Sequence, residues 1–189
     1  MKPKDKPWRN ILRPAITLSI LCFIIGVAIV GTHYFTAGII KEQQELAFFR
    51  SMERLLPAAT YVEVRSDERE EPFAFSALNE VGEVKGYLIL TSAFGYSGII
   101  EVLTAIVEGS VLAIEIVDAS GETPGLGQKI REENFTSQFH NLMAPPVLTR
   151  SSPVEVGEIQ AITGATISAE GVVKAVAEAM ELYQRYIRE

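Results

Sequence analysis

The sequence predicts an α+β protein, in which an N-terminal transmembrane helix is followed by one extracytoplasmic domain with an antiparallel sheet and packed helices. Three observations lead to this prediction. Residues 15–40 contain no Asp, Glu, Lys or Arg. Residues 73–118 consist of short apolar runs separated by turn signals, which is typical of an antiparallel meander. The last segment repeats apolar residues at steps of three and four, as a helix packed on a sheet does.

The uncharged run is long enough to cross a membrane. As a helix it extends roughly 39 Å at about 1.5 Å per residue, against a hydrocarbon core of about 30 Å. A cleaved signal peptide is the alternative, but the apolar region is too long for one and no clear A-x-A site follows it. Basic residues precede the run, so we expect a single-pass protein of the cytoplasmic (inner) membrane, with a cytoplasmic N-terminus and a periplasmic or extracytoplasmic domain.

Charge and residue usage argue against several classes of function. Five basic residues and one acidic residue precede Pro14, giving +4, so the remainder carries −11 within the net charge of −7. An acidic domain repels phosphate backbones, which argues against nucleic-acid binding. Cys22 is the only cysteine, which excludes an intrachain disulfide and a cysteine-based zinc or iron–sulfur site. His33 and His140 lie far apart in sequence, so we expect no metal site.

The chain divides into four parts. Residues 41–56 continue in a helical pattern that Pro57 ends, which indicates a stalk between membrane and domain. Residues 64–72 are charged and aperiodic, as a solvated loop is. The expected parts are a basic cytoplasmic N-terminus (1–13), a transmembrane helix (14–40), a helical stalk (41–57) and the domain (58–189).

The domain should begin with a sheet. Because short turns join its successive strands, the sheet should be an antiparallel meander with one face buried. The predicted strands are 74–78, 84–91, 99–107 and 111–118, with turns at 79–82, 95–98 and 108–110.

Three further elements follow the sheet. A helix is expected over 130–142, up to the break at Ala144-Pro145-Pro146, and then a strand over 154–162, broken at Gly157. The final helix, 167–188, has Ser168 as a candidate N-cap. Its apolar stripe consists of Val172, Val176, Met180, Tyr183 and Ile187.

A glycine-rich loop over 120–129 lies between the sheet and these elements. Its three glycines and one proline predict an ordered turn with close backbone approaches. Leu126 is out of place in a plain loop. Two interpretations stay open: Leu126 plugs the core, or it closes as a lid over a flat apolar ligand.

The segment Thr163-Gly164-Ala165-Thr166 has the residues that phosphate attachment requires. It lies at a strand-to-helix turn, where backbone N–H groups at a helix start favour a phosphate. Gly164 allows a sharp turn or the approach of a bulky group. The Thr166 hydroxyl is a candidate nucleophile toward a phosphoryl group. The alternative interpretation is a turn that only caps the helix.

Several segments in this order carry a family resemblance. They are the basic N-terminus with its membrane anchor, the Leu55-Leu56-Pro57 helix end, the turn 95–100, the loop 122–127 and the segment 163–168. The sequence resembles the FMN-binding subunits of membrane electron-transport complexes, namely the RnfG (RsxG) subunits of Rnf complexes and the related NqrC subunits of sodium-translocating quinone reductases. The resemblance spans nearly the whole chain, and the glutamate-initiated loop and compact size are closer to the Rnf subunit.

The resemblance implies a covalent cofactor. The last threonine of the motif, here Thr166, carries FMN through a phosphoester, which a flavin transferase installs from FAD with magnesium. The glycine loop and the tyrosine turn are implied to line the flavin pocket, and no side chain need act as a catalytic acid or base. The expected cofactor-binding residues are Thr166, Thr163, Gly164, Ala165, Ser168, Glu122, Thr123, Gly125, Leu126, Gly127, Tyr96 and Ser97.

Two positions depart from the family pattern. Rnf subunits often have a histidine shortly before the Glu-Thr-Pro loop, where this chain has Ala119-Ser120-Gly121, so no imidazole is available there. Thr163 stands where serine is common, which leaves a second hydroxyl close to Thr166.

The resemblance implies an electron-carrier subunit of a translocating oxidoreductase. Its partners would be the other membrane and peripheral subunits of an Rnf-type complex, which couples electron flow between ferredoxin and NAD to ion transport. Two alternatives stay open: a stand-alone membrane flavoprotein reductase or sensor, and a cofactor-free anchored scaffold domain.

Overall fold

The computed structural model describes residues 7–64, 74–150 and 155–187. The chain divides into two compact units, Met1–Ala47 and Phe48–Glu189, and each is described by itself. Helix α1, Pro7–Leu55, supplies the described part of the first unit and continues into the second. The expected division between transmembrane helix and stalk at residue 40 is therefore not marked by a break in the helix.

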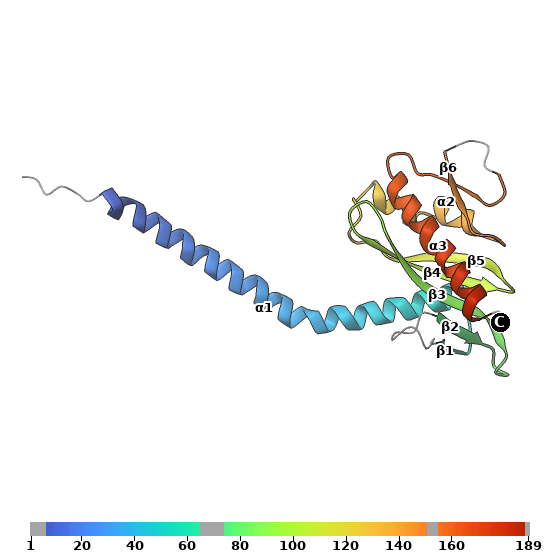
Figure 1. Ribbon diagram of the computed structural model, residues 1–189. Coiled ribbons are helices and arrows are strands. Elements are labelled where there is room, and N and C mark those ends of the chain that lie inside the picture. Colours follow the sequence, from blue (N-terminus) through green and yellow to red (C-terminus); the bar gives the residue numbers. More distant parts are fainter. Residues whose placement is uncertain (1–6, 65–73, 151–154, 188–189) are drawn as a thin grey trace, which may run out of the picture. The chain divides into compact units, whose positions relative to one another are not determined.

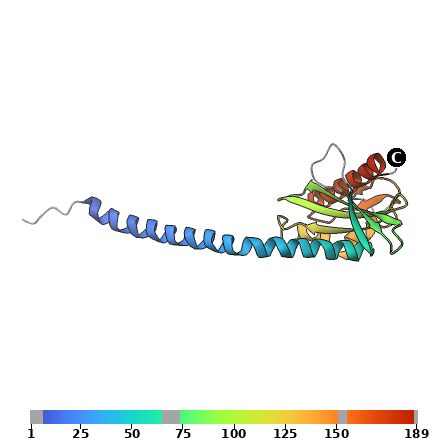
Figure 2. The ribbon, with the colours of Figure 1, turned by 90° about the horizontal axis from the view of Figure 1, so that it is seen from below.

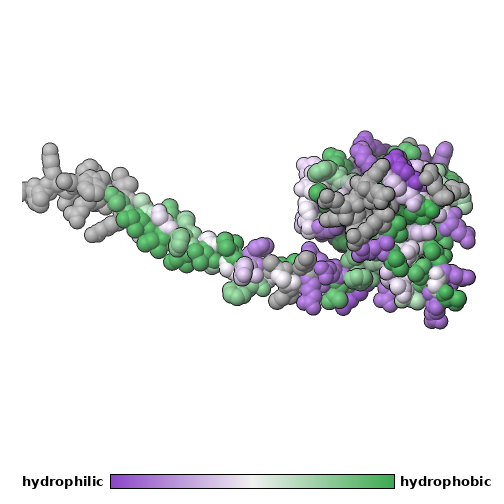
Figure 3. All heavy atoms as spheres, turned by 60° about the horizontal axis from the view of Figure 1, so that its bottom comes forward, coloured by the Kyte–Doolittle hydropathy of each residue, from purple (hydrophilic) through white to green (hydrophobic). Residues whose placement is uncertain are grey.

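Within α1, the segment Pro14–Thr36 is long and apolar enough to cross a membrane, and it is the one such helix among the described residues. Its apolar side chains are exposed, and Figure 3 shows them following one another along the helix. The hydroxyl of Thr32 donates to the Ala28 carbonyl, and that of Thr36 donates to the Thr32 carbonyl at 2.8 Å. These bonds satisfy polar groups that hydrocarbon could not solvate.

A five-stranded antiparallel sheet in the order β1-β2-β3-β4-β5 forms the centre of the second unit (Figure 1). The predicted meander is therefore confirmed. The strands are β1 Thr60–Val64, β2 Ala74–Leu78, β3 Val84–Phe94, β4 Ile99–Val107 and β5 Ser110–Asp118. Strand β1 was not predicted, and Val64, expected to begin a loop, is its last residue; the rest of that loop lies outside the described residues.

The expectation that one face of the sheet is buried is wrong, because its side chains alternate between two covered faces. On one face, Ile100 and Val102 pack into the core cluster that includes helix α3, Thr166–Tyr186. On the other face, Leu103 and Ala105 pack with Met52 and Leu56, at the end of α1. Figure 2 shows the sheet between α3 and the last turns of α1.

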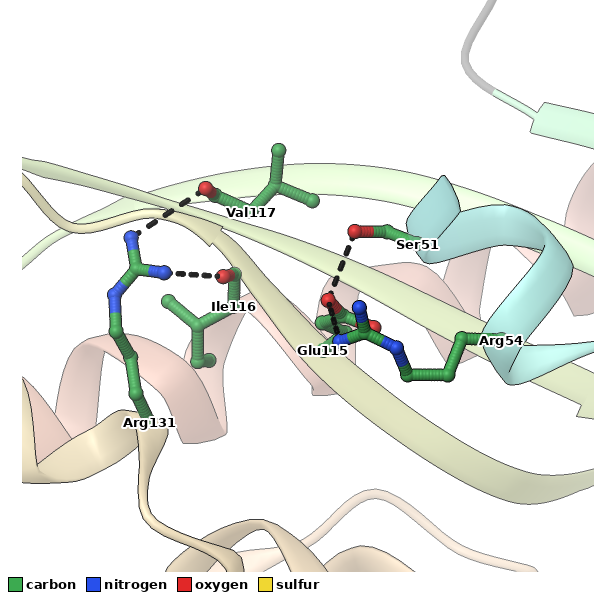
Figure 4. Close-up of polar contacts among 6 residues, drawn as sticks. All are labelled: Ser51, Arg54, Glu115, Ile116, Val117 and Arg131. Carbon is green, nitrogen blue, oxygen red and sulfur yellow. Dashed lines mark hydrogen bonds and ion pairs between the residues drawn. The ribbon is translucent and has the colours of Figure 1, made fainter. Parts of the chain in front are cut away.

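Polar contacts fasten the end of α1 to the sheet. Ser51 Oγ donates to Glu115 Oε1 at 2.8 Å, and Arg54 Nη1 lies 2.9 Å from the same oxygen (Figure 4). The Tyr61 hydroxyl donates to the Leu56 carbonyl at 2.9 Å. The last turns of α1 thus belong to the folded unit that contains the sheet.

The prediction of one continuous helix over 130–142 is wrong. The segment consists of η1 Gly127–Arg131, α2 Glu133–Thr136 and η2 Ser137–Phe139. Glu132 interrupts it with extended backbone angles, φ −70° and ψ 141°. Arg131 donates from its guanidinium to the carbonyls of Ile116 and Val117, at 3.1 and 3.4 Å, which ties this point to β5 (Figure 4).

Residue 154 of the strand predicted over 154–162 lies outside the described residues. In the described part, the strand is shorter than expected and lies outside the main sheet. It is β7, Glu158–Gln160, and it pairs in parallel with β6, Val147–Thr149, in a separate two-stranded sheet. Strand β6 was not predicted. The final helix begins at Thr166, so Ser168 is not its N-cap but lies inside the first turn.

Candidate functional site

A cavity of ≈ 410 Å³ lies where three segments of the second unit meet. Cofactor sites have volumes of about 300–1,000 Å³, so the cavity is of suitable size. The three segments are the β3–β4 hairpin turn, the glycine loop and the start of α3. Their lining residues are Tyr96, Glu122, Thr123, Leu126, Gly127, Gly164, Ala165, Thr166, Ile167 and Ser168.

The structure therefore brings together most of the residues expected to bind a cofactor. Three of the expected residues do not line the cavity, namely Ser97, Gly125 and Thr163. Ser97 instead donates its backbone N–H to Glu122 Oε1 at 3.1 Å. Ile167 lines the cavity although sequence reasoning did not single it out; its position directly after Thr166 was the available signal.

Gly164 forms the tight turn that leads into α3. The Ala165 N–H donates to the Ile162 carbonyl at 2.9 Å, and Gly164 has φ +81°, as the third residue of a type II turn does. A Cβ at Gly164 would lie 3.0 Å from Leu126 Cδ1. The turn thus needs glycine both for its backbone conformation and for the close approach of Leu126.

Leu126 lies on the wall of the cavity and is 41% exposed. It belongs to neither core cluster of the described residues. Of the two interpretations of this residue, the core plug is therefore wrong, and its closure over a ligand stays a prediction.

Thr166 is the first residue of α3 and is half-buried, whereas Thr163 is exposed in the preceding turn. In the described structure, no side chain caps the start of this helix. The first N–H groups of a helix have no intrahelical partners, and they favour an anion. The Thr166 hydroxyl consequently lies beside unpaired donors at the cavity wall.

Glu122 is the buried charged residue of the site, with 1% of its surface exposed. Its Oε1 accepts from the Ser97 N–H, and its Oε2 accepts from Ser168 Oγ at 2.5 Å. A Cβ at Gly95 would lie 2.3 Å from Oε1, and one at Gly127 would lie 2.4 Å from Oε2. The two glycines therefore leave the space that the carboxylate fills.

A second depression, of ≈ 630 Å³, borders Thr166 on the side of β6. Arg150, Glu170 and Lys174 are among its lining residues. Lys174 Nζ lies 2.8 Å from Glu170 Oε1, and this hydrogen bond lowers the pKa of the Glu170 carboxyl. The positive charge of Arg150 lowers the same pKa further. All three side chains are exposed, so this charge cluster is solvated.

Comparison with known families identifies the domain. The model of the FMN-binding domain family matches residues 95–181, a range that includes all three cavity segments. The G subunit of the proton-translocating ferredoxin:NAD(+) oxidoreductase complex of Clostridium ljungdahlii is 30% identical over 179 residues, which cover 94% of each chain. The chain belongs to the family of G subunits of ion-translocating oxidoreductase complexes. The RnfG-type resemblance predicted from the sequence is thereby confirmed.

A second relative and two solved structures are also similar to this chain. The G subunit of the Na(+)-translocating ferredoxin:NAD(+) oxidoreductase complex of Acetobacterium woodii is 30% identical, over 97% of this chain and 98% of that one. NqrC of Shewanella oneidensis has a TM-score of 0.51 at 15% identity, covering 73% of this chain and 72% of that one. The C subunit of the Na(+)-translocating NADH-quinone reductase of Parabacteroides distasonis has a TM-score of 0.52 at 20% identity, covering 61% and 62%. These two likenesses establish a shared fold.

Proposed function

We propose that this chain is a membrane-anchored electron-transfer subunit that carries FMN covalently on Thr166. The observation that supports the attachment is the position of the Thr166 hydroxyl, at the uncapped start of α3 and on the wall of the cavity that the FMN-binding domain contains. The α1 segment Pro14–Thr36 provides the anchor.

The residues of the cavity fit FMN in both polarity and size. The first-turn N–H groups of α3 suit its phosphate, because they are donors without intrahelical partners at the positive end of the helix dipole. Tyr96, Leu126 and Ile167 supply apolar and aromatic surface for the ring system. When bound, FMN supplies the redox chemistry, and the protein binds it, orients it and limits its contact with water.

The attachment step transfers a phosphoryl group to Thr166. In this step Thr166 Oγ would lose its proton and form a bond to the FMN-side phosphorus of FAD. The bond from that phosphorus to the bridging oxygen would break, and AMP would leave with the proton. A flavin transferase with magnesium would catalyse this step. The resulting phosphodiester keeps one negative charge, which is favoured at the start of α3.

Thr166 is a better acceptor than Thr163 on geometric grounds. Thr166 is half-buried at the cavity wall, whereas Thr163 is exposed and does not line the cavity. A phosphoester on Thr163 would hold the phosphate outside the first turn of α3. We therefore assign the bond to Thr166.

The partners proposed are the other membrane and peripheral subunits of an ion-translocating complex. Relatives of this chain are named as subunits of ferredoxin:NAD(+) oxidoreductase complexes. The basic residues before the anchor support a cytoplasmic N-terminus and an extracytoplasmic domain. For an exported domain, covalent attachment would prevent loss of the cofactor by dissociation.

The test is intact-protein mass spectrometry of the full chain, expressed with and without a flavin transferase. The wild-type protein should gain the mass of FMN less one water only with the transferase, and its band should fluoresce on a denaturing gel. Thr166→Ala should lose both signals, whereas Thr163→Ala should keep them. Absence of the mass increment in wild type, or its loss in Thr163→Ala with retention in Thr166→Ala, would contradict the proposal.

A further inference from the structure

Glu122 connects three segments of the site through one carboxylate. It lies in the glycine loop, accepts from the Ser97 N–H in the hairpin turn, and accepts from Ser168 Oγ in the first turn of α3. We propose that Glu122 is a positioning residue that fixes the first turn of α3, and with it the Thr166 hydroxyl. This inference rests on the proposed attachment of FMN to Thr166.

The bond to Ser168 can act on Thr166 because both lie in the same helical turn. Ser168 is two residues after Thr166 and is 1% exposed. No side chain caps the start of α3 in the described structure. The hydrogen bond between Ser168 and Glu122 therefore holds this turn in place of a cap. Without it, the first turn would be free to fray, as helix ends do.

The other end of the link is rigid. The Glu122 N–H donates to the Ala119 carbonyl at 3.0 Å, and Gln128 Nε2 donates to the Glu122 carbonyl at 3.3 Å. The hairpin turn that supplies the Ser97 N–H is closed by a bond from Gly95 N to the Gly98 carbonyl at 2.8 Å. The carboxylate therefore holds α3 to a fixed frame rather than to a loose loop.

Two glycines make room for the carboxylate. Its two oxygens lie so close to Gly95 and Gly127 that a Cβ at either position would overlap them, at 2.3 and 2.4 Å. Glycine at both positions therefore leaves the space in which the carboxylate lies, and from there it accepts from Ser168 Oγ.

To fix the first turn of α3, residue 122 needs the length of glutamate and not its charge. Glutamine has the same length, and its Oε1 can accept from the Ser97 N–H while its Nε2 donates to Ser168 Oγ. Aspartate keeps the charge but is one methylene shorter, so it cannot span the two donors. A carboxylate that acted as a base on the Thr166 hydroxyl would show the opposite order, with aspartate better than glutamine.

The experiment compares the full-length chain with Glu122→Gln, Glu122→Asp and Ser168→Ala. Each purified protein is the acceptor in FMN transfer from FAD by a flavin transferase with magnesium, and kcat and KM for the acceptor are measured. Hydrogen–deuterium exchange of the 169–172 amides, the first that donate within α3, is measured in the cofactor-free protein. Glu181→Gln and Glu181→Asp, at an exposed position of α3, are the matched controls.

We expect Glu122→Asp and Ser168→Ala to lower kcat by about ten- to a hundredfold with little change in KM, because misplacing a reacting group costs on the order of 10²-fold. The same two variants should speed exchange of the 169–172 amides, because their hydrogen bonds close the first turns of α3. Glu122→Gln and both Glu181 variants should stay close to wild type in both measurements. Ser168→Ala leaves the carboxylate in place, so it decides the matter if Glu122→Asp does not fold.

Two results would overturn the inference: a loss of kcat in Glu122→Gln at least as large as in Glu122→Asp, or unchanged 169–172 exchange in Ser168→Ala. A failure of the proposed function looks different, because wild type itself would then accept no FMN. In that case the exchange measurement on the cofactor-free proteins still decides whether Glu122 fixes the first turn.

Discussion

The substitution Gly127→Ala tests the packing around Glu122 most directly. The added Cβ would lie 2.4 Å from Glu122 Oε2 and 3.1 Å from Ser168 Oγ. Gly127 is not among the residues with positive φ, so alanine meets no backbone strain there. The cost of this change therefore comes from the overlap with the carboxylate.

The expected loss of stability combines two costs. Inserting a methyl group into a packed site costs about 1–3 kcal/mol. If the carboxylate is pushed off Ser168, a hydrogen bond to a charged group worth about 1.5–3 kcal/mol is also lost. If both costs apply, we expect the free energy of unfolding to fall by about 2.5–6 kcal/mol. For a unit of this length that corresponds to a drop in Tm of roughly 8–24 °C.

The assay is thermal unfolding of the full chain in detergent, followed by near-ultraviolet circular dichroism of its packed tyrosines. Gly127→Ala is measured in wild type and in a Glu122→Ala background, where the overlapping oxygen is absent. The loss caused by Gly127→Ala should shrink in that background, giving a coupling within the range of about 0.5–3 kcal/mol seen for contacting residues. Gly82→Ala is the control.

The control separates overlap from backbone effects. Gly82 has φ +84° and no atom within 4 Å of the point where a Cβ would lie, so its substitution costs only backbone strain and is indifferent to Glu122. Equal losses for Gly127→Ala in the two backgrounds would refute the reasoning. A loss below about 0.5 kcal/mol in wild type, within the usual range for surface substitutions, would refute it as well.

Three other predictions concern the remainder of the second unit. Met52→Ala should lower the free energy of unfolding by about 2–5 kcal/mol, because this residue of α1 is fully buried; the exposed Leu46→Ala, as control, should change it little in the same denaturant titration. Thr104→Val should raise thermal stability by about 1 kcal/mol, because its buried hydroxyl has no partner among the described residues; a lower Tm would contradict this. Burial raises the pKa of the Tyr61 phenol above 10.0, and Glu53 adds to the increase. The folded state therefore holds this proton more tightly, and the associated stability is present below pH 10 and lost as pH rises through the folded pKa. Tyr61→Phe should remove that alkaline decline in a pH series of melts.

The parts of the fold that were predictable are those with local signals. In the turn Glu108-Gly109 both residues have positive φ, and the glycine is the residue type that signals a hairpin there. Strand β1 has no such signal, because it is a short edge strand whose residues are largely exposed or half-buried. The 3-10 segments were also beyond sequence reasoning, since Arg131 is held by main-chain carbonyls of β5 that no pattern at positions 127–139 reveals.

The site was predictable for a different reason. The order of the hairpin turn, the glycine loop and the threonine segment pointed to one family, and the cavity unites those segments. The contacts inside it were not predictable. Ser168 at the start of a helix pattern is a good cap candidate by residue type. Its actual partner is 46 positions away in sequence, and only the packing of the fold brings the two together.

The contact between Glu122 and Ser168 gives two glycines of the site a specific role. In a cofactor loop, glycine is usually explained by the approach of a phosphate to the backbone. Gly95 and Gly127 instead make room for the Glu122 carboxylate, Gly95 beside Oε1 and Gly127 beside Oε2. A buried charge is costly unless hydrogen bonds satisfy it, and here a backbone N–H and a hydroxyl do so. Glycine, glutamate and serine therefore form one unit, so a change at any of them should be judged by its effect on the start of α3.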